Sequence, residues 1–366
     1  MKNVTDYVTG CFSETYAEAR EKFLAAAKEC CARVESRVLE GYRGAQGEEL
    51  AMDVARVSSQ GASSAIVVIS GTHGPEGFCG SGAQVSMLRD TELHTRLREL
   101  GTELVLIHAN NPYGFSNLQR TNEHNVDLNR NNLDFSRPLQ PNPRYKDVHD
   151  LQIPREWPPS AETRNRIAEY IRQHGELAYR SAVVQGQHTH PDGVFYAGTE
   201  TSWSLRNLHQ VLSSQSERVR IAAWIDIHTG LGPSGYAEKQ SSFSENLPLT
   251  RKIWGEDVFS LEENNANSPP IRGTIMSIVS RAFPGAQTAS IALEFGTLPW
   301  NVVSDNLRAD HWRHRYGASL QPSLIEEIKK NVKDAFYVDS DLWRGMVLGQ
   351  CRAAVMQAMY GIRALS

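Results

Sequence analysis

Two potential zinc ligands lie three residues apart in the segment His73-Gly74-Pro75-Glu76. They follow a short apolar run at 65–69, whose composition predicts a buried strand. Histidine and glutamate both bind zinc in proteins, and the adjacent glycines and proline favour a tight turn. An imidazole and a carboxylate on a turn at the end of a strand can converge on one metal ion. The sequence therefore predicts half of a metal site at this turn.

Two later apolar runs end in groups that could complete this site. The run at 220–227 is followed directly by His228, and the run at 289–295 contains Glu294 near its end. Two histidines and a glutamate form the ligand set of one class of catalytic zinc site, which leaves a fourth position for water. We therefore expect the two ligands of the turn and His228 to bind one zinc ion. Glu294 is then the spare carboxylate that could activate the water as a general base.

A loop rich in arginine and asparagine, residues 120–131, supplies a further set of polar side chains. Arg120, Asn129 and Arg130 suit a substrate carboxylate, because a guanidinium offers a bidentate fork of donors. Asp127 could accept the second N–H of a zinc-binding imidazole and so orient the ring. A solvated loop with local asparagine turns is the structural alternative for this segment.

A second pair of histidines occurs in the segment 187–193, Gln-His-Thr-His-Pro-Asp-Gly. His188 and His190 could line the substrate cleft, could form a hydrogen-bonded turn, or could hold a second metal ion. We favour the cleft over the structural turn, and the turn over the second metal.

The segment that follows the first turn, residues 77–82, offers a rival chemistry. Cys79 lies after a predicted strand, as the nucleophile of a thiol or serine hydrolase does. The glycine frame of such a motif is incomplete, because residue 81 is serine. We interpret Cys79 and Ser81 as the start of a helix in which small residues permit close packing. A non-catalytic zinc-binding protein is a third class.

The elements that must position these groups form an α/β pattern. Strands are predicted at 36–42, 49–57, 65–69, 103–108, 182–185, 220–227 and 289–295, and helices at 13–36, 80–100, 162–174, 201–213, 321–336 and 341–359. Strand, helix and strand between 65 and 108 make a parallel unit whose ligand site should lie at the carboxyl ends of the strands. We expect one domain over residues 1–366, with insertions near 110–160 and 230–272 that form the walls of a cleft.

Composition excludes several other functions. The 366 residues are 40% hydrophobic and 22% charged, with a net charge of −4 and no long block of like charge, so we expect neither nucleic acid nor a membrane as a partner. No apolar run approaches the roughly 20 residues of a membrane span. The first 20 residues lack the apolar core of a secretory signal, and the five cysteines include no C-x-x-C pair. These features predict a cytoplasmic protein with reduced thiols; they leave its oligomeric state open.

Four motifs, taken in order, resemble the zinc carboxypeptidase (M14-type) clan, which also contains succinylglutamate desuccinylase and aspartoacylase. They are His73-Gly74-Pro75-Glu76, Asp127-Leu128-Asn129-Arg130, Asp226-Ile227-His228 and Glu294-Phe295-Gly296. The loop 120–131 and the segment 185–196 are most similar to the bacterial DUF2817 branch. The resemblance implies a mixed, mostly parallel twisted sheet flanked by helices in three layers, and one zinc ion per chain.

The resemblance also implies a role for each residue at the site. Glu294 would take a proton from the metal-bound water and return it to the leaving amine, while Arg120 would stabilise the oxyanion. Asn129 and Arg130 would bind the terminal carboxylate of the substrate, and Asp127 would orient the first zinc histidine. For the active-site tyrosine of the clan, Tyr196 and Tyr236 are the candidates.

The sequence thus predicts a zinc hydrolase that cleaves an amide bond next to a free carboxylate, on a small molecule or a short peptide. A carboxypeptidase and an N-acyl-amino-acid deacylase differ in the room that the cleft leaves on the acyl side. The sequence leaves both activities open.

Overall fold

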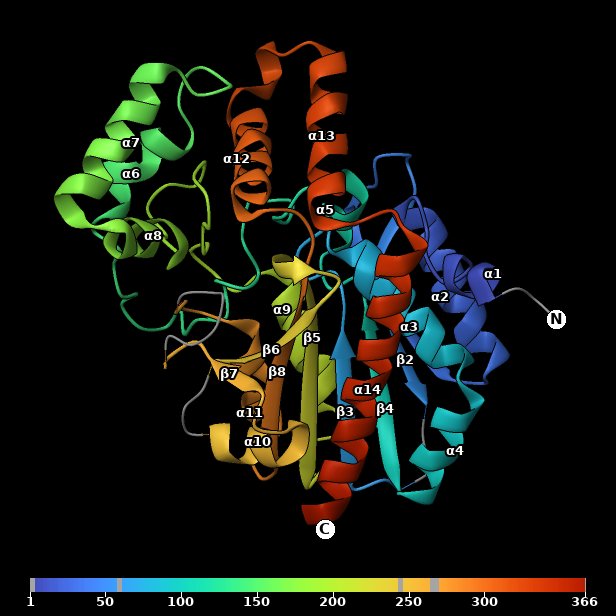
Figure 1. The fold of residues 1–366 in the computed structure, drawn as a ribbon. Helices are drawn as coiled ribbons and strands as arrows, with labels where there is room; N and C mark the ends of the chain where they lie inside the picture. Colours follow the sequence, from blue (N-terminus) through green and yellow to red (C-terminus); the bar gives the residue numbers. More distant parts are fainter. Residues whose placement is uncertain (1–3, 58–60, 243–245, 264–269, 366) are drawn as a thin grey trace.

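A mixed β-sheet is the centre of the molecule. The computed structural model describes residues 4–57, 61–242, 246–263 and 270–365. In this part of the chain, eight strands form one sheet in the order β1-β2-β4-β3-β5-β8-β6-β7 (Figure 1). The strands are β1 (Arg33–Arg43), β2 (Glu49–Val57), β3 (Ser64–Ile69), β4 (Thr102–His108), β5 (Ile221–Ser234), β6 (Ala237–Ser241), β7 (Val258–Ser260) and β8 (Gln287–Gly296).

The four central strands, β4, β3, β5 and β8, are parallel neighbours. Their middle residues are apolar and buried on both faces, which is the pattern that parallel strands covered by helices require. The outer strands β1, β2 and β6 pair antiparallel with their inner neighbours. The predicted α/β class, with a mixed sheet flanked by helices, is therefore confirmed.

Helices cover both faces of the sheet. Alternate residues of β3 belong to different cores: Ile66 and Val68 face one side, and Val67 and Ile69 face the other. The first face is covered by α2 (Tyr16–Glu29), α3 (Gly77–Arg89), α4 (Thr91–Glu99), α10 (Leu247–Trp254) and α14 (Asp341–Leu365). The second is covered by α9 (Trp203–Ser213) and α11 (Ile278–Ala282). The short helices α1 (Val4–Thr9) and α5 (Pro112–Asn117) lie beside α14 and α2, respectively.

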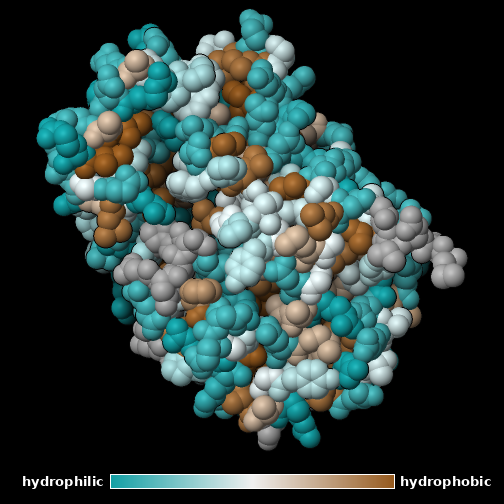
Figure 2. Space-filling view, in the orientation of Figure 1, coloured by the Kyte–Doolittle hydropathy of each residue, from teal (hydrophilic) through white to brown (hydrophobic). Residues whose placement is uncertain are grey.

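A further group of helices lies beyond the carboxyl ends of the central strands (Figure 1). It consists of α6 (Tyr145–Gln152), α7 (Ala161–His174), α8 (Glu176–Val184), α12 (Trp300–Tyr316) and α13 (Pro322–Phe336). These helices share a third apolar core, which includes Tyr145, Val303 and Phe336. Apolar residues, coloured brown, are visible between these helices on the face drawn in Figure 2. Two segments far apart in sequence thus build one roof over the end of the sheet.

Most predicted core elements are present. The parallel pairing of β3 with β4 is confirmed, although two helices, not one, connect them. The break comes at Asp90, whose Oδ1 accepts a hydrogen bond from the Leu93 N–H at 2.9 Å and so begins α4. The helix predicted at 13–36 is wrong at its end: α2 stops at Glu29, and β1 starts at Arg33.

Three other expectations need correction. The strand predicted at 182–185 is wrong, because residues up to Val184 complete α8. The insertion expected at 230–272 contains β6, α10 and β7, although no strand or helix was predicted there. Helix α12 was not predicted, because its mixed polar sequence carries no clear apolar stripe. Among the described residues, no helix has both the length and the apolar character that a membrane span needs.

Candidate metal and catalytic site

The three predicted metal ligands meet at the carboxyl ends of the central strands. His73 and Glu76 lie on the turn between β3 and α3, and His228 lies on β5. One potential ligand atom from each lies within 4.8 Å of the others, and all three side chains are buried. Two imidazole nitrogens and a carboxylate at such separations are a donor set that fits zinc.

Glu76 lies between the two imidazoles. One of its oxygens is 2.8 Å from Nδ1 of His73, and the other is 2.9 Å from Nδ1 of His228. The backbone N–H of Thr229 donates to Glu76 as well, at 3.1 Å. Although burial alone would raise it, the charges of the two histidines hold the pKa of Glu76 well below its usual range. Both Nδ1 atoms therefore face the same ionised carboxylate, that of Glu76.

A second carboxylate stands behind each imidazole. Nε2 of His73 is 3.3 Å from Oδ1 of Asp127, and Nε2 of His228 is 2.8 Å from Oδ2 of Asp226. An N–H at Nε2 that faces an aspartate leaves the lone pair of Nδ1 free for a metal ion. The structure thus places Asp127 where the sequence predicted a partner for His73. The role of Asp226 as a partner of His228 was not predicted, although its i, i+2 spacing from His228 puts both side chains on one face of β5.

Arg120 and Asp127 form an ion pair beside this cluster. Nε of Arg120 donates to Oδ2 of Asp127 at 2.9 Å, and Nη1 of Arg120 is 3.5 Å from Glu76. Burial would raise the pKa of Asp127, but the positive charges of Arg120, Arg130 and His73 hold it well below its usual range. Asp127 is therefore ionised, and it holds the Arg120 guanidinium next to the metal ligands.

Glu294 lies opposite His228 in the register of β5 and β8. Its Oε1 accepts a hydrogen bond from the Leu231 N–H at 3.1 Å. Burial and the nearby negative charge of Glu76 raise the pKa of Glu294 to about 8. A buried carboxyl that titrates near neutral pH can both accept and return a proton.

Asn129 and Arg130 face the same cavity as the cluster. Asn129 accepts from the Ile275 N–H through its Oδ1 at 3.0 Å, and its side-chain NH₂ group makes no hydrogen bond with a described residue. Arg130 donates from Nε to the Val184 carbonyl at 2.9 Å and lies over the Phe195 ring, 4.8 Å from its centroid. Burial is the main cause that lowers the pKa of Arg130 to about 10, so the guanidinium stays charged at neutral pH.

A cavity of about 110 Å³ joins these groups. Its polar side is formed by the three candidate ligands together with Glu294, Arg120, Asn129 and Arg130. Its other walls are apolar and come from η1 (Ile275–Ser277), β8 and the roof helices, with Met276, Ala292, Val303, Leu307 and Phe336. The polar groups predicted from four separate motifs therefore converge on one enclosed space.

The family whose sequence profile matches residues 12–350 is described as "Protein of unknown function (DUF2817)". The chain belongs to this family. No curated protein matches it. The solved structures similar to this DUF2817 chain include carboxypeptidase A from Helicoverpa armigera, with 12% identity, a TM-score of 0.45, and coverage of 88% of this chain and 74% of that one.

Two further solved structures show a comparable likeness. Bovine thrombin-activatable fibrinolysis inhibitor, in complex with tick carboxypeptidase inhibitor, has 13% identity and a TM-score of 0.43, with 93% of this chain and 97% of that one covered. A metallo-carboxypeptidase from Burkholderia cenocepacia has 10% identity and a TM-score of 0.39, with 95% and 69% covered.

Three of the predicted substrate residues lie outside the cavity of this DUF2817 chain. His188 lines an adjoining cavity, and His190 packs on His149 with ring centroids 4.4 Å apart. Tyr196 is buried, and its carbonyl accepts from the Asp127 N–H at 2.8 Å, so it supports the loop and does not face the substrate space. Tyr236, the other candidate tyrosine, is 45% exposed on the turn after β5.

A second metal at His188 and His190 has no support in the described residues, whose one group of three clustered ligands is the His73 triad. His190 has a different partner, since its Nδ1 is 2.8 Å from the Thr189 hydroxyl. The side chain of Gln187 bonds to the backbone of His190 and folds 187–190 into a turn, from which His188 lines the adjoining cavity; a role of this loop in substrate binding stays a prediction.

The rival nucleophiles lie in the interior. Cys79 is fully buried in α3, and burial raises the pKa of its thiol well above the usual range. Ser81 is buried too, 2.9 Å from Nε2 of His108. A Cβ at Gly80 would lie 2.5 Å from Ser70, so small residues here allow α3 to pack against the sheet, as predicted. A thiol or serine hydrolase lacks an accessible nucleophile at this position.

Proposed function

We propose that this protein is a zinc-dependent hydrolase that cleaves an amide bond next to a free carboxylate. His73, Glu76 and His228 would hold the zinc ion, with Asp127 and Asp226 orienting the two imidazoles. Bound zinc supplies an acidified water and a positive charge for the scissile carbonyl. The observation that carries the proposal is that both Nδ1 atoms face the two oxygens of one buried carboxylate.

Glu294 is the general base of the proposed reaction. Its carboxylate takes a proton from water and, after the amide bond breaks, gives it to the leaving amine. Burial raises the pKa of Glu294, and the carboxylate accepts a hydrogen bond from Leu231, which suits a group that must accept a proton and release it again. Buried polar residues around it limit the solvent that could compete for the proton.

Arg120, Asn129 and Arg130 bind and orient the substrate. The guanidinium of Arg120 is fixed by Asp127 next to the metal ligands, where it can stabilise an oxyanion without reorganisation. The NH₂ group of Asn129 and the free edge of Arg130 would donate to the substrate carboxylate; neither donor bonds to a described residue.

An N-acyl-amino-acid deacylase is a second candidate. The cavity measures only about 110 Å³, and Val303, Leu307 and Phe336 of the roof helices close it on one side. A small enclosed space favours a short acyl group over an extended peptide. The carboxypeptidase and the deacylase share the same chemistry and differ in the length of chain that this roof admits.

The test combines metal analysis of the purified protein with a screen of peptides and N-acyl amino acids by mass spectrometry. We expect about one zinc per chain, products that carry a free carboxylate next to the new amine, and loss of turnover with a chelator. Full activity in metal-free protein would exclude the proposal. Zinc binding with no turnover of either substrate class would favour the non-catalytic alternative.

A further inference from the structure

A second cavity, of about 300 Å³, adjoins the candidate active site. Arg130 lines both spaces, and it is only 4% exposed. Its Nε and Nη1 donate to the carbonyls of Val184 and Asn129, whereas Nη2 makes no hydrogen bond with a described residue. One buried guanidinium with a spare donor group thus separates the two cavities.

The charged residues in the described lining of the adjoining cavity are two arginines, Arg130 and Arg272. His188 lies beside them, and this described lining includes no aspartate or glutamate. Arg272 donates to the carbonyls of Gln140 and Pro141 at 3.4 and 3.1 Å, and to the Gln185 side chain once its amide oxygen is turned toward it. These partners are neutral, so the positive charge of Arg272 is not cancelled.

The loop that carries His188 is held in place by its neighbours. Oε1 of Gln187 accepts from the backbone N–H groups of Thr189 and His190, and the Asn142 amide donates to the Gly186 carbonyl at 3.1 Å. His188 itself makes no hydrogen bond or ion pair with a described residue. The loop therefore presents an imidazole whose donors are available to a ligand.

Two glycines let this wall approach Arg130. Gly186 has a φ of +96°, and a Cβ there would lie 3.0 Å from Cδ of Arg130. Gly273 has a φ of +69°, and a Cβ there would lie 2.1 Å from the Arg130 carbonyl oxygen. A side chain at either position would push the cavity wall away from Arg130. The two glycines therefore let the segments that carry His188 and Arg272 lie close to Arg130.

We propose that the adjoining cavity binds a second oxyanionic group, a carboxylate or a phosphate, on the same substrate. Arg130 would then lie between the two anionic ends, with Asn129 on one side and Arg272 and His188 on the other. This rests on the proposed function for the reaction, and it narrows the substrate to a compound with two negative groups. A neutral or basic second group would leave the charges of Arg130 and Arg272 without a partner.

Calorimetric titration of the zinc-loaded full chain tests this without any turnover. The probes are succinate, glutarate and adipate, with butyrate as the matched monocarboxylate, and inorganic phosphate as a competitor. We expect the best dicarboxylate to bind at least about tenfold more tightly than butyrate, because one added charge-assisted hydrogen bond has roughly that effect. Equal affinity for butyrate and all three dicarboxylates would overturn the proposal.

Two variants locate the second group. His188→Gln should reduce dicarboxylate affinity about threefold to tenfold and leave butyrate binding unchanged. Arg272→Gln should do the same, with thermal unfolding as a check on the loops that Arg272 holds. Arg33→Gln, on a distant surface, is the control. A dicarboxylate preference that survives both variants would overturn the proposal. Competition by phosphate that disappears in His188→Gln supports phosphate as the second group, and its absence supports a carboxylate.

Substrate screening separates this inference from the reaction it builds on. If amides next to a carboxylate are hydrolysed, those with a second acidic group should have the higher kcat/KM, and His188→Gln should remove that advantage. If no amide is hydrolysed, the proposed function fails, while the binding preference still reports on the adjoining cavity.

Discussion

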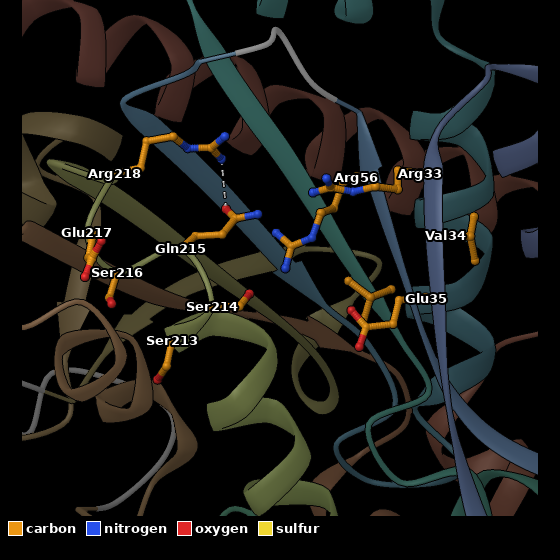
Figure 3. Close-up of a pocket in the computed structure, with 11 residues that line it drawn as sticks. Arg33, Val34, Glu35, Arg56, Ser213, Ser214, Gln215, Ser216, Glu217 and Arg218 are labelled. Atoms are coloured by element: carbon orange, nitrogen blue, oxygen red, sulfur yellow. Dashed lines mark hydrogen bonds between the residues drawn. The ribbon is translucent and has the colours of Figure 1, made fainter.

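The candidate active site and a larger groove on the protein differ in how their charges are used. The groove lies at the opposite end of the parallel strands, between β1, β2 and the segment before β5, and its volume is about 700 Å³ (Figure 3). The active-site cavity is far smaller, at about 110 Å³. Size alone would rank the groove first.

Two of the three arginines among the described lining residues of the groove, Arg56 and Arg218, are already paired. Arg218 lies 3.0 Å from Glu103 and also donates to Gln215, as the dashed line in Figure 3 shows. Arg56 lies 3.6 Å from the same carboxylate and donates to the Val211 carbonyl. In the active-site cavity, by contrast, the donors of Asn129 and Arg130 and the carboxylate of Glu294 face open space. Convergence of polar groups on open space, and not volume, thus distinguishes the candidate active site from the groove.

The largest difference between the two regions is expected for Glu294→Gln. Removal of the general base should lower kcat/KM by about 10²–10⁴-fold, while the metal content stays at the parent level. Glu35→Gln, which removes a carboxylate from the groove, is the matched control and should leave kcat/KM unchanged. Turnover kinetics with metal analysis on both variants decide it. Unchanged kinetics in Glu294→Gln would remove this residue from the mechanism.

Asp226→Asn tests whether the aspartate behind His228 serves the metal. The amide keeps the size of the side chain but removes the charge that orients Nε2, so zinc affinity should fall about 10–100-fold. Competition with a zinc chelator measures this directly. The matched change in the groove, Glu217→Gln, should have no effect on zinc affinity. An unaltered affinity in Asp226→Asn would mean that Asp226 has only a structural role.

The raised pKa of Glu294 predicts a pH effect on the metal-free protein. Since the pKa of Glu294 is about 8 in the folded state and ordinarily 4.5, the folded state binds more protons than the unfolded state between these values. This contribution to stability is present below about pH 4.5 and is lost as the pH rises toward 8. Metal-free Glu294→Gln should therefore unfold several degrees above the metal-free parent at pH 8, with a smaller difference at pH 5. Thermal melts at pH 5 and pH 8 measure this. Equal differences in melting temperature at the two pH values would show that the pKa of Glu294 is not raised.

The smallest effect is expected at the exposed rim of the groove. Arg33→Gln should change the free energy of unfolding by no more than about 0.5 kcal/mol, because surface charges contribute little. The kcat/KM value should also stay at the parent level. A loss of activity in this variant would show that the groove takes part in the reaction and that the two regions are not distinct.

The sequence was most informative where chemistry and periodicity coincide. His73, Glu76, His228 and Glu294 each follow or end an apolar run, and parallel strands bring such ends to one edge of a sheet. The parallel pairing of β3 with β4 followed from the same logic, whereas Asp127 was predicted from the partner that a zinc-binding imidazole needs. The amide and arginine donors of the loop 120–131 also reach the cavity, although no regular element positions them.

The sequence was least informative where tertiary packing decides the structure. The turn that carries His188 is set by contacts of Gln187 and Asn142, which no local pattern reveals. Residues 182–185 have strand-like composition, yet Val183 and Val184 pack into the core of the roof helices. Helix α12 has buried residues at irregular intervals, so its wall of the cavity could not be predicted from a stripe.

The roof helices α12 and α13 follow the candidate site residues in the chain, so they are synthesised later. Every proposed metal ligand and the general base lie at or before Glu294, whereas α12 and α13 extend to Phe336. A nascent chain that ends just after β8 carries the reactive groups without Val303, Leu307 and Phe336, which enclose the cavity. The cavity thus gains this apolar wall only after α12 and α13 have been synthesised, later than every proposed metal ligand and the proposed general base.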